Sequence, residues 1–442
     1  MKISIQLIVP FVVLCFSCQL VSGQAGVSSM SSSALRSGVE LKHEQIRVEE
    51  LINFHRHDIP LPAYDQRVSV DTRWGKIKGK TVFQIGLATH RDVVKEFRVP
   101  LNLVLVIDRS GSMSGDRIRQ VKESLNALTK NLAPENLVSI VTYGDNARVC
   151  LESTRVGDTE AVSKAIASIK AGGSTNLHAG LMMGYHMAEQ QFDKERANRV
   201  ILLTDGLANR GVLNENQIAE QSKAFNKKGI GLSTIGLGHN FNRNLLRELA
   251  DAGKGAIHFI ADASDIKKVF VDEFDSLLSP AANDLEVVIR VPDGAKLKKI
   301  YGYKPQQQGN VFRIPVENMS YGATQVVIGK LVAKEPVKLE VELNFFDSCT
   351  SKKVSVKRTI DTGTTESADR VLKKNYAIAK VAHAIRQSAK LSESGSHSKA
   401  VKKLKSAVGF ARGYYSEEAD ADVDRVCHMA MSIVAGVSRH SN

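Results

Sequence analysis

The pattern of apolar and polar positions changes along the chain, and each form of it predicts a different kind of structure. Between residues 99 and 278, short apolar runs alternate with amphipathic segments of helical period. A continuous apolar run such as residues 99–107 is typical of a parallel strand that is buried on both faces. Further strands of this kind are predicted at residues 137–143, 199–204, 231–236 and 256–260.

Amphipathic helices are predicted between these strands, because apolar residues recur there every three or four positions. The predicted helices cover residues 118–132, 160–169, 177–190, 216–226, 242–252 and 262–278. Repeated strand–helix units predict a doubly wound, Rossmann-like α/β domain with a mostly parallel sheet and helices on both faces. In such a sheet, ligands bind at the carboxyl ends of the strands.

On both sides of this region the pattern is that of β-strands. After Pro280, a β-sandwich-like domain is predicted from segments at residues 285–291, 297–301, 311–314, 324–331, 337–345 and 353–359. Before residue 99, a short helix is predicted at 46–54 and strands at 67–72 and 81–87. Two strands are too few for a stable sheet. We therefore infer that they pair with the strands after Pro280, so that the α/β domain is inserted into the β domain.

Three helices are predicted at the C-terminal end, where apolar positions recur with helical spacing in residues 371–385, 401–411 and 423–437. The complete predicted organisation comprises six segments. They are a signal peptide at 1–23, a flexible tether at 24–45, a helix and strands at 46–97 that the inferred pairing assigns to the β domain, the α/β domain at 98–280, the β-sandwich-like domain at 281–362 and a helical domain at 363–442.

The N-terminus predicts export from the cytoplasm. Lys2 precedes an almost entirely apolar stretch at residues 3–16, and residues 21–23 offer small side chains to a signal peptidase. Two alternatives remain open. In the first alternative, the segment is an uncleaved membrane anchor, because its length is close to the roughly 20 residues that span a bilayer. In the second alternative, Cys18 is the attachment site of a lipid. The predicted location is secreted, periplasmic or at the cell surface.

The composition is that of a globular protein with a basic surface. The 442 residues carry a formal net charge of +13, which favours acidic partners. No dense Lys/Arg run with interleaved aromatic residues is present, so nucleic acid is not a predicted partner. Residues 75–81 imitate a phosphate-binding loop, but the spacing is one residue short and no helix follows, so a basic hairpin is predicted. Outside the export segment, Cys150, Cys349 and Cys427 allow at most one intramolecular disulfide.

Three oxygen-rich segments, at residues 108–112, 172–176 and 204–206, are predicted to meet at one edge of the α/β sheet. Their hydroxyl and carboxylate side chains are hard ligands without His or Cys, which selects Mg²⁺, Mn²⁺ or Ca²⁺ over zinc. Two carboxylates only balance a divalent ion, so the ion stays electrophilic toward a carboxylate of a partner. The alternative is that these side chains merely cap helices. The candidate metal ligands are Asp108, Ser110, Ser112, Thr175 and Asp205.

These residues resemble the metal-ion-dependent adhesion site of von Willebrand factor type A domains, and the resemblance covers roughly residues 99–278 with every motif in the family's order. It implies that Ser110, Ser112 and Thr175 bind a metal ion directly. The expected ion is Mg²⁺ or Mn²⁺ rather than Ca²⁺. Asp108 and Asp205 would often act through water, and a ligand Asp or Glu would complete the shell. Residues 47–54, 58–62, 207–212 and 234–238 resemble bacterial exported A-domain proteins. The regions after residue 280 match no pattern of that group.

The predicted function is therefore metal-dependent protein binding by an exported adhesion or scaffold protein. The partner would be a protein that presents Asp or Glu, and the oligomeric state is left open. The alternative function is that of a regulatory accessory subunit of a membrane channel or transporter. An enzyme is not predicted, because no motif-borne His or Glu base accompanies the metal ligands and neither H-E-x-x-H nor G-x-S-x-G occurs.

Overall fold

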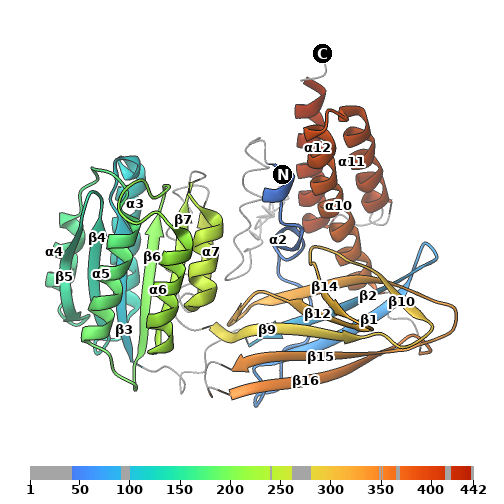
Figure 1. Ribbon diagram of the computed structural model, residues 1–442, viewed down its shortest axis with the longest axis horizontal. Coiled ribbons are helices and arrows are strands. Elements are labelled where there is room, and N and C mark those ends of the chain that lie inside the picture. Colours follow the sequence, from blue (N-terminus) through green and yellow to red (C-terminus); the bar gives the residue numbers. More distant parts are fainter. Residues whose placement is uncertain are drawn as a thin grey trace, which may run out of the picture.

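The computed structural model describes residues 42–90, 100–238, 241–260, 280–347, 350, 352–364, 369–413 and 420–439. Within them the chain forms an α/β domain, a β domain and a C-terminal helical bundle (Figure 1). The predicted signal peptide, most of the predicted tether and the predicted helix at 262–278 lie outside the described residues.

The α/β domain is built on a six-stranded sheet with the order β5-β4-β3-β6-β7-β8. Its strands are β3 (Leu101–Asp108), β4 (Leu137–Tyr143), β5 (Ala147–Arg155), β6 (Ala197–Thr204), β7 (Ile230–Leu237) and β8 (Lys254–Ile260). All neighbours are parallel except β4 and β5, so the predicted mostly parallel sheet is confirmed. The antiparallel edge strand β5 was not predicted, because Leu151 is its one buried residue and no apolar run marks it.

Helices cover both faces of this sheet, as predicted. They are α3 (Asp116–Asn131), α4 (Thr159–Ser168), α5 (Leu177–Gln190), α6 (Glu215–Lys227) and α7 (Arg243–Ala252). Successive side chains of a strand point to opposite faces, so each central strand contributes to two cores. In β3, Leu105 packs in the core with α3 and α4, whereas Val106 packs in the core with α5, α6 and α7. This arrangement explains the continuous apolar run of the strand.

The β domain consists of two antiparallel sheets. One has the order β1-β2-β14-β10, and the other has the order β11-β12-β9-β15-β16 with β13 paired to β9. Strand β2 pairs with β14, so strands on the two sides of the α/β domain share one sheet and the α/β domain is inserted between them. The bounds are β1 (Val68–Ile77), β2 (Lys80–Thr89), β9 (Pro280–Arg290), β10 (Ala295–Ile300), β11 (Gln306–Gln308), β12 (Val311–Pro315), β13 (Met319–Ser320), β14 (Thr324–Ala333), β15 (Lys338–Asp347) and β16 (Lys352–Asp361).

The two sheets enclose one core, and the helical bundle covers the outer face of the first sheet (Figure 1). Phe83 of β2 and Val287 of β9 lie in the core between the sheets. On the other face, Val326 of β14 packs in a common core with Ile378 and Leu51. The helices of this layer are η1 (His43–Gln45), α2 (Val48–Ile52), α10 (Arg370–Glu393), α11 (His397–Arg412) and α12 (Ala421–Arg439).

No helix among the described residues combines the length and the apolar composition that crossing a bilayer requires. The half-buried Cys150 and the buried Cys427 carry free thiols, and Cys349 lies outside the described residues.

Candidate metal centre

The oxygen-rich segments lie at the carboxyl edge of the α/β sheet. Strands β3 and β6 are parallel neighbours, with Ile107 opposite Leu203, so the residues that follow them lie side by side. The segment at residues 172–176 is tied to the segment at residues 108–112 by backbone hydrogen bonds. The N–H of Gly111 donates to the carbonyl of Gly173 at 3.0 Å, and the N–H of Gly172 donates to the carbonyl of Arg109 at 2.6 Å. The three loops therefore form one structure.

Close approaches bring four of the five predicted ligands into one cluster, and Asp108 joins this cluster through the backbone N–H of Ser110. The Oγ atoms of Ser110 and Ser112 are 3.1 Å apart, and the Ser112 hydroxyl donates to Asp205 Oδ1 at 2.7 Å. Thr175 Oγ1 and Ser112 Oγ both approach Gly206, where a Cβ atom would lie 3.6 Å and 3.9 Å from them. Ser112 is exposed whereas the other four ligands are buried, so the cluster reaches solvent through Ser112.

Asp108 is completely buried at the base of the cluster. Its Oδ1 accepts the N–H of Ser110 at 2.8 Å, and its Oδ2 accepts the hydroxyl of Thr204 at 2.8 Å. Burial raises the pKa of Asp108, the two hydrogen bonds oppose the rise, and the nearby charge of Asp205 adds to it. A buried carboxylate beside a second carboxylate is stabilised by a cation. The site is therefore built to receive positive charge.

Arg117, in the first turn of α3, was missed from the sequence. Its Nη1 donates to Asp205 Oδ2 at 2.7 Å and to the carbonyl of Ser112 at 3.1 Å. Asp205 is thereby held from both sides, with one oxygen on Ser112 and the other on the guanidinium. The D-x-S-x-S pattern does not predict that Arg117 contacts Asp205, because the contact depends on where α3 lies in the folded domain.

Asp145, which follows β4, was also missed and fixes the loop that carries Thr175. Its Oδ1 accepts the hydroxyl of Ser174 at 2.6 Å and Nη1 of Arg210 at 3.1 Å, and these bonds hold the pKa of Asp145 below its usual range. Gly173 has φ +91°, and a Cβ atom there would lie 2.8 Å from Asp145 Oδ2. The close approach of Asp145 therefore requires glycine at this position.

The donor set fits a small divalent cation. Oxygen ligands about 2.1 Å from an octahedral Mg²⁺ lie about 3 Å from their neighbours. Two pairs of side-chain oxygens in the cluster are 2.7 Å and 3.1 Å apart. The described residues contain no group of three or more His, Cys, Asp or Glu that could hold a metal. Three of the five candidate ligands are hydroxyl groups, which are donors that suit Mg²⁺ or Mn²⁺ better than zinc.

Residues 102–272 match the family model of the von Willebrand factor type A domain. The central domain is a von Willebrand factor type A domain. The matched segment contains all five candidate ligands, so the resemblance seen in the motifs extends over the whole domain.

Several proteins of known sequence are similar to part of this chain, and two bacterial relatives match more of it than the A domain alone contains. The uncharacterized protein YfbK of Escherichia coli (strain K12) is 30% identical over 288 residues, which are 62% of this chain and 50% of YfbK. The uncharacterized protein sll0103 of Synechocystis is 26% identical, over 63% of this chain and 64% of sll0103. Inter-alpha-trypsin inhibitor heavy chain H1 of Bos taurus is 26% identical, over 42% of this chain and 22% of the relative. The chain thus spans about half the length of YfbK and less of the heavy chain.

A solved structure resembles the chain beyond the A domain. The von Willebrand factor type A protein from Catenulispora acidiphila aligns with a TM-score of 0.51 and 15% identity, over 85% of this chain and 98% of that chain. At this identity the likeness concerns the fold, including regions that flank the A domain.

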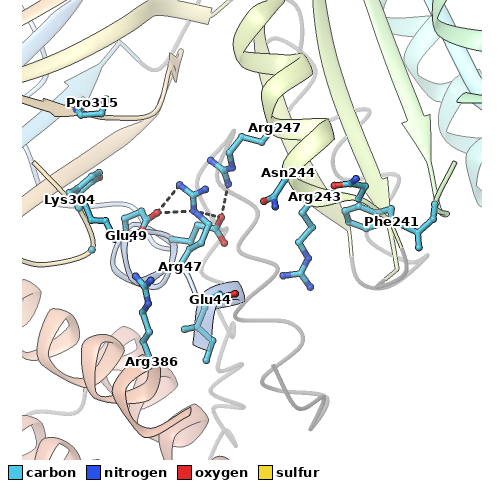
Figure 2. A pocket seen from close by; sticks show the side chains of 16 residues that line it. Glu44, Arg47, Glu49, Phe241, Arg243, Asn244, Arg247, Lys304, Pro315 and Arg386 are labelled. Carbon is cyan, nitrogen blue, oxygen red and sulfur yellow. Dashed lines mark hydrogen bonds and ion pairs between the residues drawn. The ribbon is translucent and has the colours of Figure 1, made fainter. Parts of the chain in front are cut away.

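A cavity of about 630 Å³ lies where the A domain meets the β domain and the helices. Figure 2 shows Arg243 and Arg247 extending from α7 toward the segment that carries Arg47 and Glu49. Arg247 donates to Glu50 at 2.6 Å and to Glu317 of the β domain at 2.5 Å.

Leu207 lines this cavity and follows Asp205 and Gly206 in the chain. Burial raises the pKa of Glu50 to about 7, against the attraction of Arg247. The A domain is thus joined to the rest of the molecule by partly buried ion pairs, at a cavity that the residue two positions after Asp205 also lines.

Proposed function

We propose that the protein is an exported, metal-dependent adhesion or scaffold protein that binds an acidic residue of a protein partner. The observation that carries the proposal is the cluster of three hydroxyls and two carboxylates at the open edge of the A-domain sheet. A Mg²⁺ or Mn²⁺ ion bound there would act as a Lewis acid toward a carboxylate of the partner. We also propose that the protein acts by binding a partner and is not an enzyme.

The chain's own residues have distinct parts in this proposal. As the resemblance to the von Willebrand factor type A family implies, Ser110, Ser112 and Thr175 would hold the ion directly. These neutral hydroxyls would leave the positive charge of the ion available to a partner. Asp108 keeps the first loop folded by accepting the N–H of Ser110. Asp205 orients the hydroxyl of Ser112, which is the exposed ligand and lies nearest to an incoming partner.

We propose that the protein is secreted, periplasmic or at the cell surface, and that residues 1–23 are the export signal. In the alternative form of this proposal, an uncleaved or lipidated N-terminus attaches the protein to a membrane. The partner proposed for this location is a protein that presents Asp or Glu.

Capture of surface proteins by the immobilised chain tests the proposal. Capture is expected in Mg²⁺, and EDTA or Asp108→Ala is expected to abolish it while the circular dichroism spectrum stays unchanged. Asp116→Ala is the matched control, because Asp116 is exposed on α3 and pairs with Arg119 outside the cluster. Amidation of the carboxylates of the captured proteins should remove binding. Capture that survives EDTA and amidation would reject the proposal.

The second candidate function, an accessory subunit of a channel or transporter, is favoured by the ion pairs of Arg247 with Glu50 and Glu317. They connect the A domain to the β domain and so provide a physical link between ligand binding and domain arrangement. Co-purification with a membrane transporter from detergent extracts, lost in EDTA, would support this function over adhesion. Co-purification of soluble surface proteins alone would reject it.

A further inference from the structure

A lysine-lined cleft of about 440 Å³ lies across the first sheet of the β domain, apart from the metal centre. It is formed by the start of β2, the end of β14 and part of β10, and the helical bundle stands on the same sheet (Figure 1). Among the described residues, no Asp or Glu lines the cleft. The lysines of the lining are Lys80, Lys298, Lys299 and Lys330.

The strand register places like charges directly opposite each other. Lys299 of β10 is the cross-strand partner of Lys330 of β14. Lys330 also faces Val82 of β2. Lys80 lies two positions before Val82, on the same face of the strand. Like charges that face each other across a sheet destabilise it, so this arrangement opposes folding unless an anion is present.

Helices of the bundle add more positive charge to the same place. Burial lowers the pKa of Lys299 to about 8, and the charges of Lys330 and Lys403 lower it further. Burial together with Lys80, Lys78 and Lys330 lowers the pKa of Lys380, in α10, to about 8. Among the described residues, the charges that lower the pKa values of Lys299, Lys330 and Lys380 belong to other lysines.

Neutral groups hold the ammonium groups in position. Lys299 Nζ donates to Nε2 of His383, and burial with the surrounding cations lowers the pKa of His383 to about 4, so the imidazole is a neutral acceptor. Lys380 Nζ lies 3.2 Å from the ring centroid of Phe410, and Lys299 Nζ lies 4.8 Å from that of Tyr301. Aromatic faces attract a cation without removing its charge. The positive charge therefore stays available to a ligand.

We propose that Lys80, Lys299, Lys330 and Lys380 form a binding site for a small ligand that carries two or more phosphate or sulfate charges. Ammonium groups from three strands and a helix can each donate to a different oxygen of such a ligand, and hydrogen bonds between charged partners are the strong ones. Lys80 reaches the site through the β1–β2 hairpin, whose turn has both Lys78 and Gly79 at positive φ. The basic hairpin predicted from the sequence thus contributes a lysine to an anion site.

Calorimetric titration of the full chain with inorganic pyrophosphate tests the proposal, in EDTA so that the metal centre takes no part. Binding is expected, and K299Q/K330Q should weaken it by about tenfold for each lysine removed, since a hydrogen bond to a charged group contributes at least that factor. K352Q/K353Q is the matched control, because both lysines are exposed on β16 in the other sheet. Parallel titrations with sulfate and with orthophosphate, which carry one anionic group each, compare the two types of group. Absence of binding to all of these anions, or equal affinity of the two double variants, would overturn the proposal.

Thermal denaturation supplies a test that does not depend on the variants. Pyrophosphate is expected to raise the melting temperature of the wild-type chain more than sodium chloride of the same ionic strength does. Equal shifts in the two salts would contradict the proposal. The double variant should melt at or above the wild-type temperature without anion, because it lacks the repulsion, and it should not respond to pyrophosphate.

Discussion

The metal centre and the lysine cleft are opposite in charge but alike in construction. The metal centre gathers oxygen atoms around Asp108 and Asp205, whereas the cleft gathers ammonium groups around Lys299 and Lys330. Each holds buried or half-buried like charges that a counter-ion would stabilise. The origin of the residues differs. The oxygen ligands come from three short loops at one sheet edge, and the lysines come from strands and helices of two regions.

This difference determines how each site responds to mutation. The metal-centre loops are linked to one another by hydrogen bonds, so removal of one member disturbs the positions of the others. The lysines repel one another and are held by separate elements, so removal of one is expected to relieve its neighbours. The two sites should therefore show effects of opposite sign on the stability of the ligand-free protein.

The largest effect is expected for Asp108→Ala. Mutation of groups that only support metal ligands costs about 10- to 100-fold in metal affinity. Loss of the buried carboxylate of the cluster should therefore weaken Mn²⁺ binding by about 100-fold or more. Titration of the variant and of the Asp116→Ala control with Mn²⁺, followed by calorimetry, measures it. An affinity within a factor of a few of the wild-type value would show that the cluster does not hold the ion.

A smaller loss is expected for Asp145→Ala, which leaves all five candidate ligands in place. The variant lacks the acceptor that holds the hydroxyl and the N–H of Ser174, so the loop with Thr175 becomes less ordered. Mn²⁺ affinity should fall by about tenfold, the lower end of the range for supporting groups. Arg210→Ala, which removes only the exposed partner of Asp145, should change the affinity much less. Equal losses in the two variants would contradict this role of Asp145.

A gain in the stability of the anion-free protein is expected for Lys330→Gln in the lysine cleft. Removal of one of two like charges on facing strands should raise the free energy of unfolding by about 0.5 kcal/mol in the absence of anions. Urea denaturation at pH 7 measures the change, with Lys352→Gln as the control on the other sheet. A clear loss of stability would show that Lys330 is a structural residue.

The smallest effect is expected in the pH dependence of stability that the lysine cleft contributes. The folded-state pKa of Lys299 is lowered from 10.5 to about 8. The unfolded chain therefore binds more protons between these values, and stability due to this lysine rises as the pH increases from about 8 to 10.5. Lys299→Gln should reduce that rise in urea denaturation series, whereas Lys352→Gln should not. An unchanged slope in Lys299→Gln would contradict the depressed pKa.

The sequence predicted the features that depend on local pattern. The bounds of β4 and α5 follow from apolar runs and helical spacing, and the five candidate ligands follow from motifs directly after strands or before a helix. Strand β5 and the short β11, with three glutamines, have no apolar pattern and were missed. Arg117 and Asp145 depend on where α3 and β4 lie relative to the loops. The pairing of Lys299 with Lys330 depends on strand register, which a single sequence does not show.

The location of one metal ion tests the central claim most directly. A crystal of the full chain grown with Mn²⁺ should show a single anomalous peak in contact with the hydroxyls of Ser110, Ser112 and Thr175. Water or a neighbouring carboxylate is expected on the open side of the ion. A peak elsewhere, or loops at residues 108–112 and 172–176 that have separated around an empty space, would contradict the proposed metal-dependent binding.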